Sequence, residues 1–325
     1  MTMAHMIHEF GGPDQLVWQA VSLPDPGPNE VRLRQITVGM NMMEIGLRIG
    51  AYPGPPLPFV PGVEAAAVVE AVGSNVTEVA VGDRVGYAGN PIGSYCEERN
   101  FPAERLFPLP DEISDKTAAA SMVKGMTAEF MLRRSYPVGN GSQVLIHAAA
   151  GATGLMCVQL ARHLGAEVFG TVSSDDKAEF VRGFGCDHPI VYTRDNFADV
   201  ILDATNGRGV DIIYDSIGKD TFEDSVRCLQ PLGTLCLFGV ASGPPPALDL
   251  MNQDLMTAKY FNRPSLYAHT AKRDHMLDLA AQTFSDVSAG ILRTEIFAEF
   301  PLRNAAEAHR AVESRKTQGA IVFNV

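Results

Sequence analysis

Apolar and polar residues follow two different rhythms in the two parts of this chain. Up to about residue 120, short apolar runs are separated by links rich in glycine and proline, such as residues 24–28 and 53–56. Apolar runs of this length between turn residues are typical of strands. We therefore expect a compact, mostly antiparallel β domain, with strands at residues 31–39, 65–72 and 84–88.

From Ser114 onward, longer segments of helix-forming residues enter the pattern. Ser114 has the position and chemistry of an N-cap for a helix that reaches about Arg134. Strands and helices then alternate strictly, which is typical of a parallel, doubly wound sheet. The expected strands are residues 144–147, 167–172, 190–192, 210–215 and 233–239, and the helices between them are 154–164, 177–184, 197–205 and 222–229. The tail adds helices near 274–288 and 304–313 and a last strand at 320–325.

The longest apolar stretch, residues 144–161, has the length of a short membrane span. It is interrupted by His147, Gly151, Gly154 and Gln159, so we expect a buried strand followed by a buried helix. The first ten residues lack the basic start and apolar core of a signal peptide or transit peptide. These features predict a cytoplasmic protein.

Charge and cysteine content narrow the possible partners. The formal net charge is −12 over 325 residues, and no basic block exists to neutralise phosphates, which excludes nucleic acid and anionic membranes as expected partners. The five cysteines are scattered and odd in number, which does not predict a disulfide framework. The length suits two domains. Small molecules are therefore the default partners.

The segment from Ala148 to Gly154 carries the strongest local signal. It joins an apolar strand to a helix through small residues, in the pattern A-x-x-G-x-x-G. Small residues let the backbone approach a pyrophosphate, and a helix N-terminus presents N–H groups to that anion. The pattern is weak alone, but at the start of a β-α-β-α series it favours a nucleotide site over a purely structural turn.

The end of the second strand distinguishes the two nicotinamide cofactors. An acidic residue there favours NAD, because it accepts a hydrogen bond from the ribose 2′-OH. Here Ser173 and Ser174 end the strand and Lys177 follows, a set that suits the 2′-phosphate of NADPH. In the alternative interpretation Ser174 is only a helix cap, and the neighbouring acids Asp175 and Asp176 leave NAD binding open. Beyond the third strand, Tyr192 and Arg194 either flank the adenosine or lie on a solvated loop.

Blocks in the same order along almost the whole chain resemble the zinc-independent quinone oxidoreductases (the ζ-crystallin-like group) of the medium-chain dehydrogenase/reductase superfamily. The blocks that carry the resemblance are residues 39–41, 61–64, 81–85, 124–128, 147–151, 170–173, 214–218, 263–266 and 315–319. The resemblance implies an α/β fold that joins a GroES-like β domain to a Rossmann domain with a doubly wound parallel sheet. It divides the chain into residues 1–122 (catalytic domain), 123–263 (NADPH-binding domain) and 264–325 (return to the catalytic domain). It also implies an active site in the cleft between the domains, and a homodimer.

The same resemblance implies a set of cofactor-binding residues. These are Asn41, Thr127, Thr153, Gly154, Ser173, Lys177, Tyr192, Ser216, Phe238, Gly239, Val240, Arg263 and Arg315. The zinc-dependent relatives carry a histidine before the glutamate of the block at 61–64 and have closely spaced cysteines. Here Val63 precedes Glu64 and Cys96 has no cysteine neighbour, so no metal site is expected.

Two departures from the family pattern leave the acceptor open. The quinone reductases are expected to have an aromatic residue near position 46 and an asparagine after Phe238-Gly239, whereas this chain has Gly46 and Val240. We expect a wider and less polar substrate pocket. Without a metal, the protein must orient the dihydronicotinamide and supply a polar partner for developing charge.

Asn41 is the candidate for positioning the nicotinamide ribose or the substrate oxygen, and Glu44 for orienting its neighbours. Tyr52 is a candidate proton donor or stacking residue; in the alternative interpretation it is only an amphipathic cover over the domain. Three functions are therefore considered. They are an NADPH:quinone reductase, an NADPH-dependent reductase of alkenes, enones or enoyl thioesters, and a non-catalytic NADPH-binding redox sensor.

Overall fold

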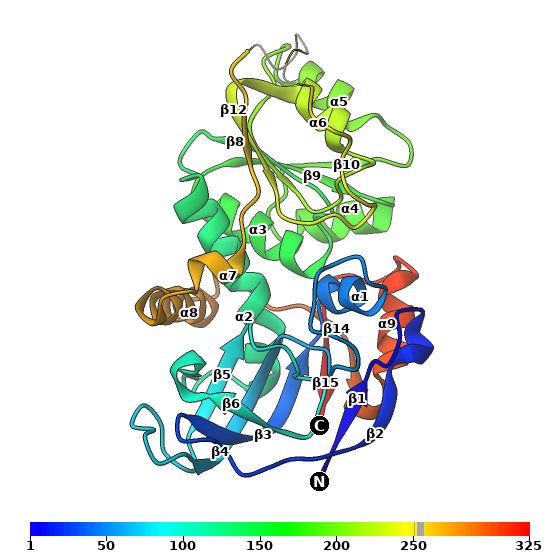
Figure 1. Ribbon diagram of the computed structural model, residues 1–325. Coiled ribbons are helices and arrows are strands. Elements are labelled where there is room, and N and C mark those ends of the chain that lie inside the picture. Colours follow the sequence, from blue (N-terminus) through cyan, green and yellow to red (C-terminus); the bar gives the residue numbers. More distant parts are fainter. Residues whose placement is uncertain (250, 252–256) are drawn as a thin grey trace. The chain divides into compact units, whose positions relative to one another are not determined.

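The computed structural model describes residues 1–249, 251 and 257–325, which form two compact units (Figure 1). Unit 1 contains Met1–Met126, His269–Ser288 and Thr294–Val325. Unit 2 contains Thr127–Ala268 and Ala289–Arg293. Among the helices of the described residues, none is both long and apolar enough to cross a membrane.

Unit 2 is built on a six-stranded sheet in which every neighbouring pair of strands is parallel. The strand order is β10-β9-β8-β11-β12-β13. The strands are β8 (Gln143–Ile146), β9 (Glu167–Val172), β10 (His188–Val191), β11 (Val210–Asp215), β12 (Leu229–Leu237) and β13 (Tyr260–Asn262). The predicted doubly wound parallel sheet is therefore confirmed. β13 was not expected, and β10 begins at His188, where partly exposed residues break the apolar run.

Helices cover both faces of this sheet. Figure 1 shows α3 (Ala152–His163) and α4 (Asp175–Arg182) on one face and α5 (Phe197–Ala204) and α6 (Phe222–Cys228) on the other. The strands are buried on both faces, as in β9, where five of its six residues are buried. On the α5–α6 face, Leu145, Ile213 and Leu235 of three strands pack against Phe197 and Phe222. The apolar stretch 144–161 is thus β8 followed by α3, as predicted.

Unit 1 is organised around a seven-stranded sheet with the order β14-β15-β3-β4-β5-β7, in which β6 also pairs with β3. The strands are β3 (Glu30–Gly39), β4 (Glu64–Val72), β5 (Arg84–Ala88), β6 (Glu98–Pro102), β7 (Phe107–Pro108), β14 (Ile296–Pro301) and β15 (Ala320–Asn324). All pairs are antiparallel except β14 with β15. A separate hairpin is formed by β1 (Thr2–Met6) and β2 (Val17–Val21). The prediction of a mostly antiparallel β domain is confirmed.

The helices of the β part begin and end for identifiable reasons. α2 (Asp115–Glu129) has Ser114 before it, whose Oγ accepts a hydrogen bond from the Thr117 N–H at 3.1 Å, so the predicted N-cap is confirmed. The helix expected to reach Arg134 changes at Glu129 into a π-helical segment, Phe130–Ser135. The described residues also form the α-helices α1 (Met42–Arg48), α7 (Leu266–His269), α8 (Arg273–Ser288) and α9 (Ala305–Glu313). α1 and α7 were not expected.

Candidate functional site

The carboxyl ends of the parallel strands gather most of the predicted cofactor residues at one edge of unit 2. Ser173, Tyr192, Ser216, Phe238 and Arg263 are each the first residue after a strand, from β9 to β13 in chain order. The strand order reverses between β8 and β11, because the chain runs outward in opposite directions from these two central strands. Ligands of doubly wound folds bind outside the carboxyl ends of the strands at such a reversal. This edge is therefore the candidate site of unit 2.

The turn after β8 is tight enough to require glycine at one position. Ala148 has a left-handed backbone (φ 50°), and its carbonyl accepts a hydrogen bond from the Gly151 N–H at 2.9 Å. A Cβ on Gly154 would lie 2.3 Å from the same carbonyl oxygen, whereas a Cβ on Gly151 would lie 3.2 Å from it. Gly154 is thus needed for the close approach of α3 to the turn.

A buried histidine, His147, contacts two hydroxyl groups next to this turn. The ring nitrogens of His147 lie 3.0 Å from Thr171 Oγ1 and 2.9 Å from Ser225 Oγ. Burial lowers the pKa of His147, which favours the neutral ring. The Thr171 hydroxyl also accepts a hydrogen bond from the Ala148 N–H at 3.2 Å, so these contacts link the ends of β8 and β9.

The start of α3 fits a bound phosphate group. Its N-cap is Gly151, which has no side chain to accept from the helix N–H groups, and its first turn, residues 152–155, contains no acidic residue. A helix N-terminus with this composition offers N–H donors and a positive dipole end to an anion. Thr153 lies in this first turn, partly exposed. The turn and helix start therefore fit the pyrophosphate of a dinucleotide.

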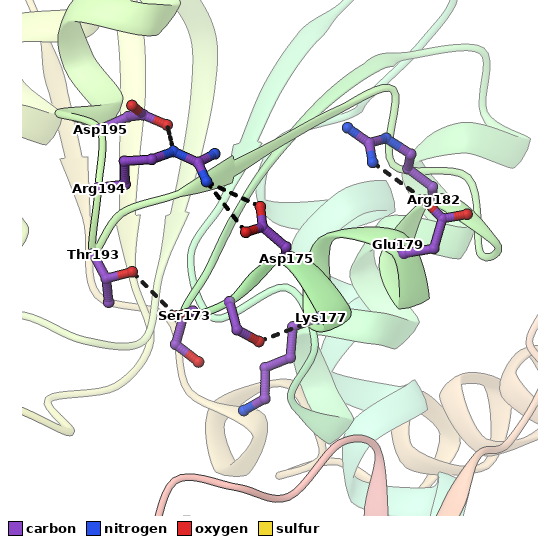
Figure 2. Close-up of polar contacts among 9 residues, drawn as sticks. Ser173, Asp175, Lys177, Glu179, Arg182, Thr193, Arg194 and Asp195 are labelled. Atoms are coloured by element: carbon purple, nitrogen blue, oxygen red, sulfur yellow. Dashed lines mark hydrogen bonds and ion pairs between the residues drawn. The ribbon is translucent and has the colours of Figure 1, made fainter.

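The ends of β9 and β10 carry the residues predicted to distinguish NADPH from NADH (Figure 2). Ser174 is the N-cap of α4, with its Oγ accepting from the Lys177 N–H at 3.3 Å, so the capping interpretation of Ser174 is confirmed. Lys177 is partly buried, and this desolvation lowers the pKa of its amino group. Tyr192 is 47% exposed, and Arg194 is ion-paired with Asp175.

The loops after β11 and β12 are fastened to each other by a buried aspartate. Asp215 Oδ1 accepts hydrogen bonds from the Ile217 and Gly218 N–H groups at 2.7 and 3.1 Å, and its Oδ2 accepts one from Thr221 Oγ1 at 2.8 Å. The Asp215 carbonyl accepts the Phe238 N–H at 2.8 Å. Ser216 is thereby brought beside residues 238–240.

Close backbone packing fixes this pair of loops further. A Cβ on Gly239 would lie 2.8 Å from the Ser216 carbonyl oxygen, and the Ala241 N–H donates to that oxygen at 3.0 Å. Arg263 donates from Nη1 to the Leu237 carbonyl at 3.2 Å, which attaches the residue after β13 to the end of β12. Thr127 also belongs to unit 2, but it lies on α2, which does not follow a strand of this sheet.

Asn41 lies in unit 1, in a network of buried polar groups. It is the N-cap of α1 and forms a capping box with Glu44, whose Oε2 accepts a hydrogen bond from the Asn41 N–H at 2.8 Å. Its Nδ2 donates to Glu64 Oε1 at 2.9 Å. Glu64 also accepts from the Val123 N–H at 2.8 Å and forms a fully buried ion pair with Lys124. Glu44 and Glu64 together fix the orientation of the Asn41 amide.

Glu44 is a buried titratable group of this network, and its surroundings change its pKa. Burial, followed by the repulsion of Glu64, raises the pKa of Glu44 to about 7, against the attraction of Lys124. A buried carboxyl group of this kind exchanges protons near neutral pH. The part expected for Glu44 as an orienting residue agrees with its capping box around Asn41.

The remaining predicted site residues of unit 1 are Tyr52 and Arg315. The ring of Tyr52 packs on Gly46 of α1. Arg315 is exposed and has a left-handed backbone (φ 60°) in the turn after α9. Sequence reasoning did not single out His147 or Asp215 as supports for the site. The only signal for either was a polar residue at the end of an apolar strand.

Within the described residues, no group of three or more His, Cys, Asp or Glu side chains is arranged to hold a metal ion. The five cysteines are buried free thiols, and none of them belongs to such a group. The carboxylate of Glu64, the acidic residue of the block at 61–64, is engaged by Lys124 and by the Val123 N–H.

Comparison with known proteins identifies the family. Residues 27–137 match the alcohol dehydrogenase GroES-like domain, and residues 152–282 match the family described as zinc-binding dehydrogenase. The chain is 43% identical to 2-haloacrylate reductase of Burkholderia sp, over 99% of both chains. It is 41% identical to a quinone oxidoreductase of Pseudomonas aeruginosa, over 97% of both chains.

Solved structures agree with these relatives. Quinone oxidoreductase of Escherichia coli complexed with NADPH is 35% identical and superposes with a TM-score of 0.96, covering 99% of this chain and 100% of the other. The GroES-like and Rossmann parts of the fold prediction are confirmed by these matches. The chain belongs to the quinone oxidoreductase branch of the medium-chain dehydrogenase/reductase superfamily.

Proposed function

We propose that this protein is an NADPH-dependent quinone reductase, which transfers hydride from NADPH to a quinone without a metal. The observation that carries the proposal is the row of predicted cofactor residues at the carboxyl ends of the parallel strands, beside a helix start that fits a pyrophosphate. The similarity to an Escherichia coli quinone oxidoreductase complexed with NADPH supports it.

The residues proposed to hold the cofactor divide by the part of the molecule they would bind. Thr153 and Gly154 would bind the pyrophosphate at the start of α3, and Ser173, Lys177 and Tyr192 the adenosine with its 2′-phosphate. The other proposed cofactor residues are Asn41, Thr127, Ser216, Phe238, Gly239, Val240, Arg263 and Arg315. The bound dihydronicotinamide supplies the hydride.

Asn41 and Tyr52 are the residues proposed to act at the reacting end. Glu44 and Glu64 restrict the Asn41 amide to one orientation, so that its remaining hydrogen-bonding capacity has a fixed direction. An amide held in this way is suited to position a ribose hydroxyl or a substrate oxygen without reorganising. The Tyr52 hydroxyl is the proposed proton donor, with water as the alternative source.

A second activity, reduction of a carbon–carbon double bond conjugated to a carbonyl group, is favoured by a specific comparison. The chain is 43% identical to 2-haloacrylate reductase over nearly its whole length. Val240, where an asparagine is expected in the quinone reductases, gives the loop after β12 an apolar residue. An apolar residue at this point suits a less polar acceptor than a quinone.

Oxidation of NADPH, followed by absorbance at 340 nm, tests these proposals. A panel of quinones and a panel of enones, haloacrylates and enoyl thioesters are compared at equal concentrations, with NADH run in parallel. The quinone proposal requires the higher kcat/KM on quinones. The reverse order assigns the alkene reductase activity. Tight NADPH binding without turnover on either panel would leave only the non-catalytic redox sensor.

We further propose a homodimer with the domain limits 1–122, 123–263 and 264–325. The dimer is supported by β13, which is the strand at the end of the six-stranded sheet and carries Tyr260 and Phe261 at 57% and 38% exposure. An end strand with exposed aromatic residues offers unpaired backbone groups and apolar area to a second copy. Light scattering after size exclusion measures the mass. The monomer mass of 35.0 kDa would contradict the dimer.

A cytoplasmic location is proposed from the cysteines. Cys96, Cys157, Cys186, Cys228 and Cys236 are all buried free thiols, a state maintained in a reducing compartment. Fractionation of the source cells with immunodetection tests this proposal.

A further inference from the structure

Two neighbouring strand ends meet where the adenosine ribose is proposed to bind. Ser173 follows β9 and Tyr192 follows β10, and the Thr193 hydroxyl donates to the Ser173 carbonyl at 3.2 Å. This contact holds the loop after β10 against the end of β9. Figure 2 shows the side chains of Ser173 and Lys177 at this place, with α4 beginning between β9 and Lys177.

Arg194 in the same loop is held by two carboxylates. Its Nη1 lies 3.1 and 3.3 Å from the two oxygens of Asp175, and its Nε lies 3.2 Å from Asp195 Oδ2. These carboxylates raise the pKa of Arg194, with Asp175 making the largest contribution. Figure 2 shows the Arg194 side chain directed to Asp175 and the Lys177 side chain directed the other way.

The ion pair is exposed, so its contribution to folding is small. The side chains of Arg194 and Asp175 are 59% and 79% exposed, and exposed pairs of this kind add little to the free energy of unfolding. Their consequence is in the local charge. Asp175 is the first residue of α4, two residues after Ser173, close to the position where this fold uses an acid to select NAD.

An unpaired carboxylate at Asp175 would act against NADPH in two ways. It would repel the dianionic 2′-phosphate, and it would be available to accept a hydrogen bond from the 2′-OH of NADH. Arg194 compensates the charge of Asp175 and occupies both of its oxygens.

We propose that Arg194 is a specificity-determining residue, which favours NADPH over NADH by holding the Asp175 carboxylate. The proposal rests on the NADPH-dependent function proposed above. Arg194 acts here as a positioning residue through Asp175, while Ser173 and Lys177 are the residues proposed to bind the phosphate. The pair allows an acidic first turn, which suits the positive end of the α4 dipole, to coexist with a site for an anion.

Calorimetric binding to four ligands tests the proposal, namely NADPH, NADH, 2′,5′-ADP and 5′-ADP. The variants are Arg194→Gln, Asp175→Asn and the double variant. Arg182→Gln is the matched control. Like Arg194, Arg182 is exposed and paired with a carboxylate of α4, in its case Glu179 at 3.3 Å. Thermal unfolding verifies that each variant folds.

The expected result is a pattern over the variants. Arg194→Gln weakens NADPH and 2′,5′-ADP by about 3- to 10-fold, since an exposed charge acts on a doubly charged group. Binding of NADH and 5′-ADP is unchanged or stronger. Asp175→Asn alone and the Arg182→Gln control bind NADPH and 2′,5′-ADP, the two ligands with a 2′-phosphate, at least as tightly as the wild type. The double variant recovers the wild-type affinity for NADPH within about 2-fold.

Three results would overturn the proposal. If the double variant binds NADPH as weakly as Arg194→Gln, then Arg194 contacts the phosphate directly and does not act through Asp175. If Arg194→Gln leaves the NADPH:NADH affinity ratio of the wild type intact, Arg194 has no part in specificity, although the proposed function stands. If the wild type does not prefer NADPH and 2′,5′-ADP over NADH and 5′-ADP, the proposed cofactor is itself wrong.

Discussion

The ring of Tyr52 lies directly against the backbone of Gly46, so that a Cβ on Gly46 would come within 2.2 Å of Tyr52 Cδ2. The two residues are also joined through the backbone, because the Tyr52 N–H donates to the Gly46 carbonyl at 3.2 Å. Gly46 is one of the two departures from the family pattern. The aromatic ring of Tyr52, from the loop after α1, fills the space beside position 46. The expectation of a wider pocket at Gly46 did not take this ring into account.

Replacement of Gly46 by alanine should therefore destabilise unit 1. The added methyl group would displace the Tyr52 ring, at a cost of about 1–3 kcal/mol, against a gain in helix propensity of about 1 kcal/mol. In a Tyr52→Ala background the clash is absent, and the same change should stabilise α1. Urea unfolding of the four proteins in this cycle measures both values. Equal effects of Gly46→Ala in the two backgrounds would mean that the ring moves away freely.

The buried ion pair of Lys124 and Glu64 gives a second prediction. Both side chains are at most 1% exposed. Lys124→Met leaves the Glu64 carboxylate without its cation and should lower the free energy of unfolding by about 3–5 kcal/mol. The double variant Lys124→Met/Glu64→Gln should recover much of this loss, because the neutral amide no longer needs a cation. Denaturant unfolding at pH 7 compares them, and an additive double variant would contradict the coupling.

Stability should depend on pH through Glu44. Burial raises the pKa of Glu44 from 4.5 to about 7, so the folded state holds this proton more tightly than the unfolded state does. The resulting stabilisation is complete below about pH 4.5 and is lost as the pH rises through about 7; it amounts to about 3 kcal/mol. Glu44→Gln should lose this dependence.

The measurement is the difference in unfolding free energy between wild type and Glu44→Gln from pH 4.5 to 8. The unfolding free energy of the wild type minus that of Glu44→Gln should fall steadily up to about pH 7 and then stay constant. A difference that does not change with pH would show that Glu44 is ionised throughout this range in the folded protein.

The strand ends of unit 2 were predictable from sequence because local patterns define them. The parallel strands β8 to β12 contain apolar runs, and the residue after each strand lies at the shared edge by topology alone. α1 was not predicted, since it is short and contains a glycine. β13 was not predicted either, because it has only three residues, two of which are exposed, and so forms no buried apolar run.

The network around Asn41 was only partly predictable. Asn41 and Glu44 are three residues apart and form a local capping box, which a sequence pattern can indicate. Glu64, however, is 23 residues further along the chain than its partner Asn41. Lys124 is another 60 residues beyond Glu64. Only the pairing of β3 with β4 and the placement of α2 bring these charges together, and neither follows from local sequence.

Gly154→Ala should damage the turn after β8, with Gly151→Ala as a matched control. The Cβ at position 154 would lie 2.3 Å from a backbone oxygen, which cannot swing away as a side chain does. We expect a loss of about 1–3 kcal/mol in stability and NADPH binding weakened about 10-fold or more. At position 151 the contact is 3.2 Å, so the loss should stay below about 1 kcal/mol. Similar losses for both variants would contradict the assignment of the close approach to Gly154.

Lys177→Ala should separate the two cofactors most clearly. Its amino group is proposed to form a charge-assisted hydrogen bond with the 2′-phosphate, and such bonds contribute about 1.5–3 kcal/mol. NADPH binding should therefore weaken by about 10- to 100-fold, while NADH binding changes by less than about 3-fold. Burial lowers the pKa of the Lys177 amino group. Lys177→Gln, which keeps a hydrogen-bond donor without the charge, should bind NADPH with an affinity between those of wild type and Lys177→Ala. Fluorescence titration of each variant with both cofactors gives the ratio. Equal weakening of NADPH and NADH would show that Lys177 supports the fold around Ser173, and the strand-end argument for NADPH would then fail.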